Sequence, residues 1–133
     1  MENTIKGKIL IMDDEESVRQ VSVEMLKHME YEVESVKDGA EAVEVYSSAL
    51  ESGKPFDVII MDLTIPGGMG GKEAIKKLLE IDPGIRAIVS SGYPGDPVMS
   101  NFRDYGFSGI VEKPFRIGEL SEQIRKLIKK AES

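Results

Sequence analysis

The 133-residue chain contains no cysteine, no tryptophan and a single histidine, His28. Without cysteine, neither a disulfide framework nor a thiolate metal site can form, and His28 has no second imidazole with which to share a metal ion. No apolar run approaches the ~20 residues that span a bilayer, so membrane insertion is not expected. Residues 1–6 are not followed by the apolar core of a secretion signal, which makes a cytoplasmic location the simplest expectation.

Positive charge is also scarce, with 17 lysines and arginines against 24 aspartates and glutamates and a net charge of −7. Because an acidic domain repels the phosphate backbone, direct binding of nucleic acid is not expected. The composition, 41% hydrophobic and 31% charged, is that of an ordinary globular protein, and 133 residues predict a single domain over the whole chain.

Short apolar runs alternate with amphipathic segments along the chain. This alternation predicts an α/β fold in which a parallel sheet is covered by helices on both faces. The first helix is expected to bury a stripe of apolar side chains, and a weaker periodicity predicts a helix over 96–105. The expected strands are 8–12, 31–36, 58–61, 85–89 and 109–111, and the stripe of the first helix is Val18, Val21, Met25, Leu26 and Met29.

The expected strands end in polar residues of a restricted kind. Asp13 and Asp14 follow the first strand, Asp62 ends the third, Ser91 follows the fourth and Lys113 follows the fifth. Because the carboxyl ends of parallel strands lie at one edge of the sheet, we expect these side chains to converge there. Clustered carboxylates repel one another unless a cation joins them, and hard oxygen ligands suit Mg²⁺. The spacing therefore predicts a magnesium site.

The motifs Ile11-Met12-Asp13-Asp14-Glu15, Met61-Asp62-Leu63 with Pro66, Ser91-Gly92 and Lys113-Pro114-Phe115 together resemble the receiver domain of two-component response regulators. The resemblance covers nearly the whole chain. It implies a flavodoxin-like (βα)5 sandwich with strand order 2-1-3-4-5. It also implies a signalling switch rather than a metabolic enzyme, one that catalyses only its own phosphorylation and dephosphorylation.

The resemblance assigns a role to each motif residue. Asp62 is implied to be the phosphoacceptor, which takes a phosphoryl group from a phosphohistidine. Asp13, Asp14 and Asp62, with the backbone carbonyl of Thr64, are implied to bind Mg²⁺. A histidine kinase or histidine phosphotransfer domain is the implied partner, and a weak homodimer is left open.

The same resemblance implies the parts of the switch. Ser91 is implied to close on the phosphoryl group, and Lys113 to pair with the carboxylate and then with that group. Pro114 is implied to be a cis proline. The switch position three residues before the lysine is Ile110 instead of an aromatic residue. The sequences of the glycine-rich loop 67–71 and of the segment around Ser91 most resemble those of receivers in hybrid histidine kinases.

Other interpretations fit less well. A P-loop would need glycine at Pro66 and serine or threonine at Glu73, so that motif fails. A haloacid-dehalogenase-type phosphatase would need a second aspartate where Thr64 stands. A purely structural pseudo-receiver would not need the acidic residues together with Lys113. Ser90 neighbours Ser91, and only the spacing to Lys113 in the resembling family favours Ser91.

Overall fold

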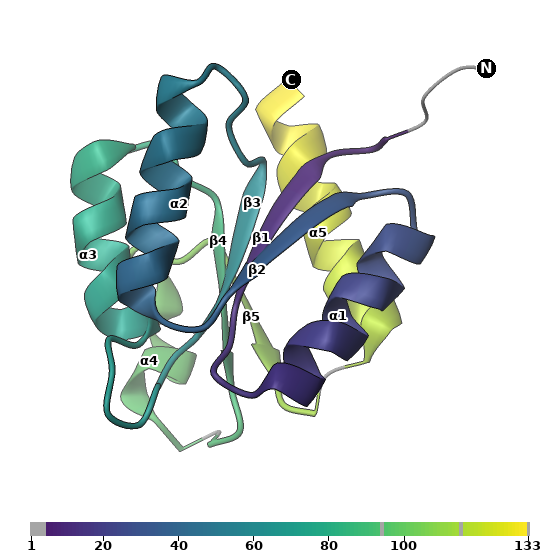
Figure 1. Cartoon of the computed structure of the whole chain (residues 1–133). Coiled ribbons are helices and arrows are strands. Elements are labelled where there is room, and N and C mark those ends of the chain that lie inside the picture. The colour runs from purple at the N-terminus through teal and green to yellow at the C-terminus, as the bar shows by residue number, and fades with distance from the viewer. Residues whose placement is uncertain (1–4, 94, 115, 133) are drawn as a thin grey trace.

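The computed structural model describes residues 5–93, 95–114 and 116–132. In this part of the chain one parallel sheet of five strands carries helices on both faces (Figure 1), and its strand order is β2-β1-β3-β4-β5. The expected fold class is therefore confirmed. The strands are β1 (Lys8–Met12), β2 (Glu32–Val36), β3 (Val58–Asp62), β4 (Ala87–Ser91) and β5 (Gly109–Glu112). The helices are α1 (Glu16–His28), α2 (Gly39–Glu51), α3 (Gly71–Ile81), α4 (Pro97–Ser100), the 3-10 helix η1 (Phe102–Tyr105) and α5 (Ile117–Glu132).

The central strand β3 is buried along its whole length, because it pairs with β1 on one side and β4 on the other and both of its faces are covered. Ile59 and Met61 belong to the core beneath α2 and α3, whereas Val58 and Ile60 belong to the core beneath α1 and α5. This two-sided burial explains why the strand reads as an unbroken apolar run.

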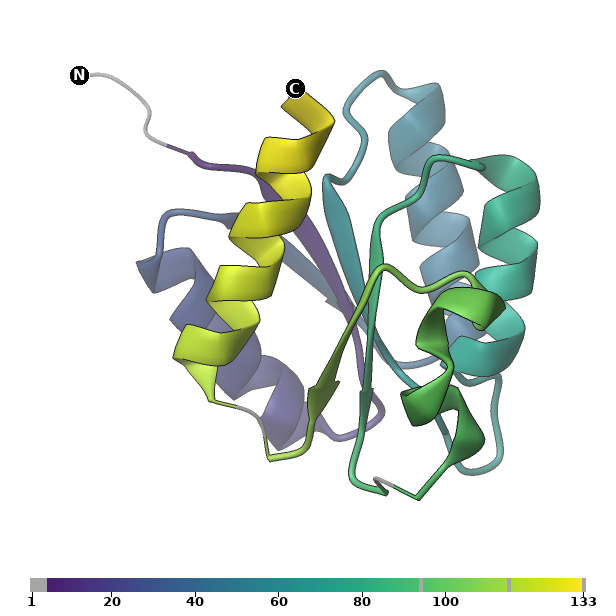
Figure 2. The same cartoon turned by 180° about the vertical axis from the view of Figure 1, so that it is seen from behind.

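Three helices bury apolar side chains against the sheet. Figures 1 and 2 show α2 and α3 on one face of the sheet and α1 and α5 on the other. Within the described ranges, no helix combines the length and the apolar character needed to cross a bilayer. The buried residues are Ala42, Tyr46 and Ala49 of α2, Ala74, Ile75 and Leu78 of α3, and Leu120 and Ile124 of α5.

Helix α1 is turned relative to the prediction. Leu26 is fully buried as expected, but Val21 and Met25 are 54% and 41% exposed, and the small polar Ser22 takes an inward position instead. A serine between a helix and a sheet permits close approach, while apolar residues on the outer face are common on folded proteins. The prediction was wrong here because it assumed that every apolar residue of the stripe faces the core.

The helix predicted over 96–105 is instead two short pieces. Asp96 caps α4 by accepting a hydrogen bond from the Val98 N–H at 2.9 Å, but the helix ends at Ser100. The 3-10 helix η1 follows after Asn101 and ends at Gly106, whose φ of 102° is left-handed. Strand β4 begins at Ala87, two residues later than predicted. Ile85 still belongs to the preceding turn, because its N–H donates to the Asp82 carbonyl at 3.1 Å.

Candidate functional site

Three carboxylates meet at the carboxyl edge of the sheet. Asp13 follows β1, Asp62 ends β3 and Asp14 begins the loop to α1. Each offers an oxygen that lies within 4.8 Å of the other two. Asp13 and Asp62 are only 3% and 8% exposed, whereas Asp14 faces solvent. The structure thus brings together the three aspartates that the sequence placed at strand ends, with one of them open to an approaching ion.

Lys113 joins two of these carboxylates. Its Nζ donates to Asp13 Oδ2 at 2.6 Å and to Asp62 Oδ2 at 2.8 Å. The Lys113 N–H donates to the Ser91 carbonyl at 2.8 Å, which ties the end of β5 to the end of β4. The Lys113–Pro114 peptide bond is cis, and Phe115 of the sequence motif lies outside the described residues.

The environment acts against the charged form of Asp62 and in favour of the charged form of Lys113, as the pKa of each group shows. Burial raises the pKa of the Asp62 carboxyl and the Asp13 charge adds to this, while Lys113 and the Thr64 N–H oppose it. Burial alone would lower the pKa of Lys113, but its contacts with Asp13 and Asp62 outweigh that effect, so the pKa is raised. The lysine has two anions beside it, whereas Asp62 has one cation and one anion.

Ser91 lies at the rim of this cluster, 5% exposed. The Tyr93 N–H donates to its Oγ at 3.0 Å, so the hydroxyl is turned toward its own loop. Ser90 is buried as well, and its carbonyl accepts the Leu63 N–H at 2.8 Å. The Ser91 hydroxyl also donates to the Tyr93 carbonyl at 3.4 Å, so a rotation toward a new acceptor would cost two hydrogen bonds.

The glycine-rich loop after β3 lets α3 approach the strand end. Gly67 has a left-handed φ of 75°, which favours glycine. A Cβ at Gly70 would collide with the Leu63 carbonyl oxygen, and the Gly71 N–H donates to that same oxygen at 3.0 Å. The loop leaves Thr64 exposed beside Asp62. The glycines therefore serve close packing and do not merely loosen the loop.

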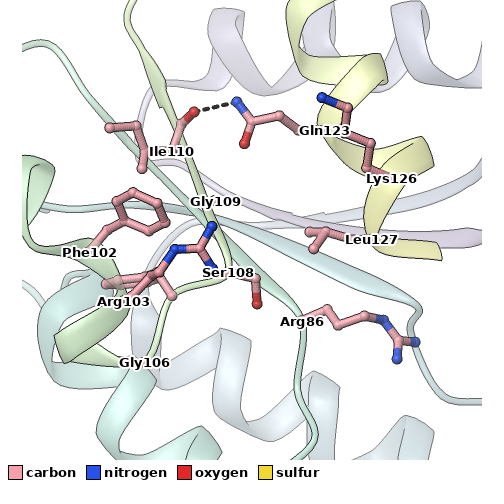
Figure 3. A pocket seen from close by; sticks show the side chains of 11 residues that line it. Arg86, Phe102, Arg103, Gly106, Ser108, Gly109, Ile110, Gln123, Lys126 and Leu127 are labelled. Atoms are coloured by element: carbon pink, nitrogen blue, oxygen red, sulfur yellow. Dashed lines mark hydrogen bonds between the residues drawn. The ribbon is translucent and has the colours of Figure 1, made fainter. Parts of the chain in front are cut away.

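Ile110, at the expected switch position, is half-buried and packs against the core beneath α2 and α3. Its carbonyl accepts a hydrogen bond from Gln123 Nε2 of α5 (Figure 3). An open groove of about 920 Å³ lies beside it, between η1 and α5. Phe102 and Leu127 line this groove together with the cationic Arg86, Arg103 and Lys126.

Arg19 of α1 also belongs to the site, and the sequence reading missed it. Its Nη1 donates to the backbone carbonyl of Asp13 at 2.7 Å. The only signal in the sequence is a basic residue about one turn into the helix that follows the acidic pair, and such residues are common on helix surfaces.

Comparisons with known proteins agree with this geometry. The family model of the response regulator receiver domain matches residues 9–125. The chemotaxis protein CheY of Thermotoga maritima is 32% identical over 123 residues, which are 92% of this chain and 98% of CheY. The sensor kinase CckA of Brucella abortus is 29% identical over 122 residues, but this chain spans only 12% of that kinase.

A solved structure is similar as well. The receiver domain of the sensor histidine kinase PA1611 from Pseudomonas aeruginosa PAO1, which holds a magnesium ion in its active site cleft, superposes with a TM-score of 0.80. The two are 23% identical, and the match covers 92% of this chain and 98% of that one. The chain belongs to the response regulator receiver domain family, and its function is that of a phosphoacceptor domain in two-component signalling.

Proposed function

We propose that Asp62 is the phosphoacceptor and that a phosphohistidine of a kinase or phosphotransfer domain is the donor. The observation that carries this is the Asp62 carboxylate itself. It stands at the end of the central strand, within 4.8 Å of Asp13 and Asp14 oxygens, and its Oδ2 is 2.8 Å from Lys113 Nζ. A carboxylate so placed is an oxygen nucleophile with cationic charge beside it.

The donor set fits magnesium. Carboxylate oxygens without thiolate or imidazole are the ligands of a hard divalent cation. Asp13, Asp14 and Asp62, with the carbonyl of Thr64, would hold the ion. The magnesium ion seen in the similar PA1611 receiver supports this proposal. When bound, Mg²⁺ supplies positive charge that offsets the carboxylates and the oxygens of the incoming phosphoryl group.

The side chains of this chain would then perform the transfer. A carboxylate oxygen of Asp62 forms a bond to phosphorus while the phosphorus–nitrogen bond of the phosphohistidine breaks, and the electron pair of that bond leaves with the imidazole. Lys113, already 2.8 Å from Asp62, pairs with a phosphoryl oxygen. The Ser91 hydroxyl, which donates to the Tyr93 carbonyl at 3.4 Å, would donate instead to another phosphoryl oxygen. Tyr93, which is 68% exposed, stands beside this position and would slow attack by water.

Labelling by a small phosphodonor tests the assignment. With phosphoramidate and Mg²⁺, the protein should gain one acid-stable, base-labile phosphoryl group, and EDTA should block the reaction. Asp62→Asn should lose the label. Asp57→Asn is the matched control, because Asp57 precedes the same strand at its opposite end and bonds the Lys8 N–H instead. Labelling of Asp62→Asn at the wild-type level on another residue would refute the assignment.

We also propose where partners bind. Val21 and Met25 form an exposed apolar pair on α1, the helix that follows the acidic pocket, and would contact the phosphodonor domain. The groove between η1 and α5 would contact the output partner, because η1 follows the Ser91 loop in the chain. The polar variants Val21→Ser and Met25→Gln should slow phosphoryl transfer from a kinase but should not slow labelling by phosphoramidate.

The type of signalling pathway in which the domain works is a further question. We propose that the 133 residues act as one receiver domain, in the cytoplasm, in a relay of the hybrid-kinase type. The similarity to CckA supports the relay, and a similarity of the same order to CheY fits a stand-alone receiver. Transfer from phosphorylated protein to an isolated histidine phosphotransfer domain would support the relay, and retention of the label would oppose it.

A further inference from the structure

The Arg19 side chain extends back beyond the first residue of α1 and contacts the backbone of Asp13. The backbone N–H of Arg19 donates to the Glu15 carbonyl at 3.0 Å, while its side chain turns back so that Nη1 lies 2.7 Å from the Asp13 carbonyl oxygen. The guanidinium thus contacts the main chain of a residue in the acidic pocket. Charge-assisted bonds of this kind are roughly twice as strong as neutral ones.

This contact completes the fixation of Asp13. The Asp13 N–H donates to the Val36 carbonyl at 3.1 Å, Oδ1 accepts the Glu15 N–H at 2.9 Å, and Oδ2 accepts Lys113 Nζ at 2.6 Å. Among the residues that the structure describes, Arg19 alone donates to the Asp13 carbonyl. Since that carbonyl belongs to the peptide that joins Asp13 to Asp14, its orientation also sets the direction in which Asp14 leaves the strand.

The electrostatics favour the same role. Asp13, Asp14 and Asp62 repel one another, and Glu15 and Glu16 follow at once in the chain. Arg19 is half-buried and places its positive charge at the backbone carbonyl of Asp13, whereas Lys113 contacts the carboxylate of the same residue. Arginine keeps this charge at every working pH and fixes direction through its planar fork, which lysine does not.

We propose that Arg19 is a positioning residue, which holds the Asp13–Asp14 peptide so that both carboxylates point toward the cation. The inference rests on the proposed function. Arg19 does not touch the phosphoryl group, so its loss should weaken the affinity for Mg²⁺ and leave the transfer step itself intact. Removing a group that orients a metal ligand typically weakens metal affinity about 10–100-fold.

The experiment compares Arg19→Gln with the wild type in the full chain. Calorimetric titration with MgCl₂ should show an affinity about tenfold lower. The Mg²⁺ concentration that half-saturates phosphoramidate labelling should rise by the same factor, while the rate at saturating Mg²⁺ stays within about twofold. In the metal-free protein, the amide ¹⁵N shift of Asp14 should move, because it reports the bond to the Asp13 carbonyl.

Two further variants serve as controls. Arg125→Gln removes the same charge from α5, where the arginine pairs with Glu122 in solvent, and should leave the affinity for Mg²⁺ unchanged. Arg19→Lys keeps the charge on a shorter side chain and should fall between Arg19→Gln and the wild type. If Arg19→Gln fails to fold, Arg19→Lys carries the same measurements.

The outcomes separate this inference from the proposed function. Wild-type affinity in Arg19→Gln, or equal losses in Arg19→Gln and Arg125→Gln, would overturn the positioning role. A loss of rate at saturating Mg²⁺ without a loss of affinity would overturn it too. If the wild type itself neither binds Mg²⁺ nor takes a label at Asp62, the proposed function fails instead.

Discussion

Lys113 is bonded to two carboxylates, whereas Asp62 has one ammonium partner and one like-charged neighbour. The pocket is therefore favourable for the lysine and costly for the aspartate. Burial deprives the Asp62 charge of water, and one hydrogen-bonded cation shared with Asp13 does not restore all of that lost solvation. Asp62 is thus held in a state that a cation or a phosphoryl group would relieve.

The raised pKa of Asp62 predicts a pH dependence of stability. The folded carboxyl holds its proton more tightly than the unfolded one, whose pKa is 3.8, so the ionised form lowers the free energy of unfolding at neutral pH. In EDTA at pH 7, Asp62→Asn should therefore unfold at a higher temperature than the wild type.

The difference between the two proteins should shrink as the pH falls through the raised pKa toward 3.8, because the wild-type carboxyl then becomes neutral. Thermal denaturation between pH 4 and 8 measures this, with Asp57→Asn as the control. A lower melting temperature for Asp62→Asn at pH 7 would show that the bond to Lys113 outweighs the cost of burial.

Residues that act through side-chain charge could be found from the sequence, and residues that act on the backbone could not. Asp13, Asp62 and Lys113 stand at strand ends, and strand ends follow from apolar runs. Arg19 and Gln123 donate to the carbonyls of Asp13 and Ile110, and no pattern of residue types marks which carbonyl a long side chain will reach.

At the level of elements, the segment between β4 and β5 is unlike the rest of the fold. Helix α4 is a single turn, and η1 follows it after a break at Asn101. Ile110 on the neighbouring strand has no ring to rotate, and its branched side chain has few staggered positions. A signal from Ser91 is therefore expected to pass through the backbone of this segment, in which Gly92 and Gly95 permit movement.

Hydrogen exchange can follow this segment. Beryllofluoride, which mimics the phosphoryl group, should change exchange from Ser91 to Tyr105 in the wild type. Ser91→Ala should bind the mimic but lose the change, because the hydroxyl that responds to it is missing. Ile110→Ala should retain the change while losing about 1–3 kcal/mol of stability.

Two results would contradict this mechanism. One is an unchanged segment in the wild type, and the other is a normal response in Ser91→Ala. A response lost in Ile110→Ala at a temperature where that variant is folded would instead place the switch on strand β5.

The two elements that were predicted wrongly, α1 and the segment 96–105, differ from the prediction for different reasons. The prediction placed Val21 and Met25 inside because they are apolar, yet the outer face of α1 carries them and Ser22 lies within. Periodicity locates an apolar stripe to within about one residue, which corresponds to ~100° of helix rotation. In the segment 96–105, the Asp96 cap starts a helix, but the backbone leaves the helical conformation at Asn101.

On the scale of the whole molecule, the site draws on the sheet and on the helical layer that contains α1. Helix α1 supplies Arg19, the centre of the sheet supplies Asp62 and the β5 end supplies Lys113. An ion bound among them interacts with the folded chain and not with the unfolded one, since the unfolded chain does not assemble the three carboxylates. Its binding free energy therefore adds to the stability of the fold.

Mg²⁺ should accordingly raise the melting temperature of the wild type. At a hundredfold excess over the dissociation constant the gain is about 2.7 kcal/mol. Asp14→Ala should lose this response and be at least as stable as the wild type without metal, because it removes an exposed member of the like-charged cluster. Differential scanning calorimetry with MgCl₂ and EDTA measures both, and a melting temperature that ignores millimolar Mg²⁺ would argue against a metal site.

Strand β1 begins, and helix α5 ends, on the side of the molecule opposite to the acidic pocket (Figure 1). Every strand runs the same way, so the amino ends of the sheet face one hemisphere and its carboxyl ends face the other. A tether, a surface or a neighbouring domain joined at either end would therefore leave the reactive hemisphere unobstructed. Immobilising the protein through β1 or through α5 should leave its rate of labelling unchanged.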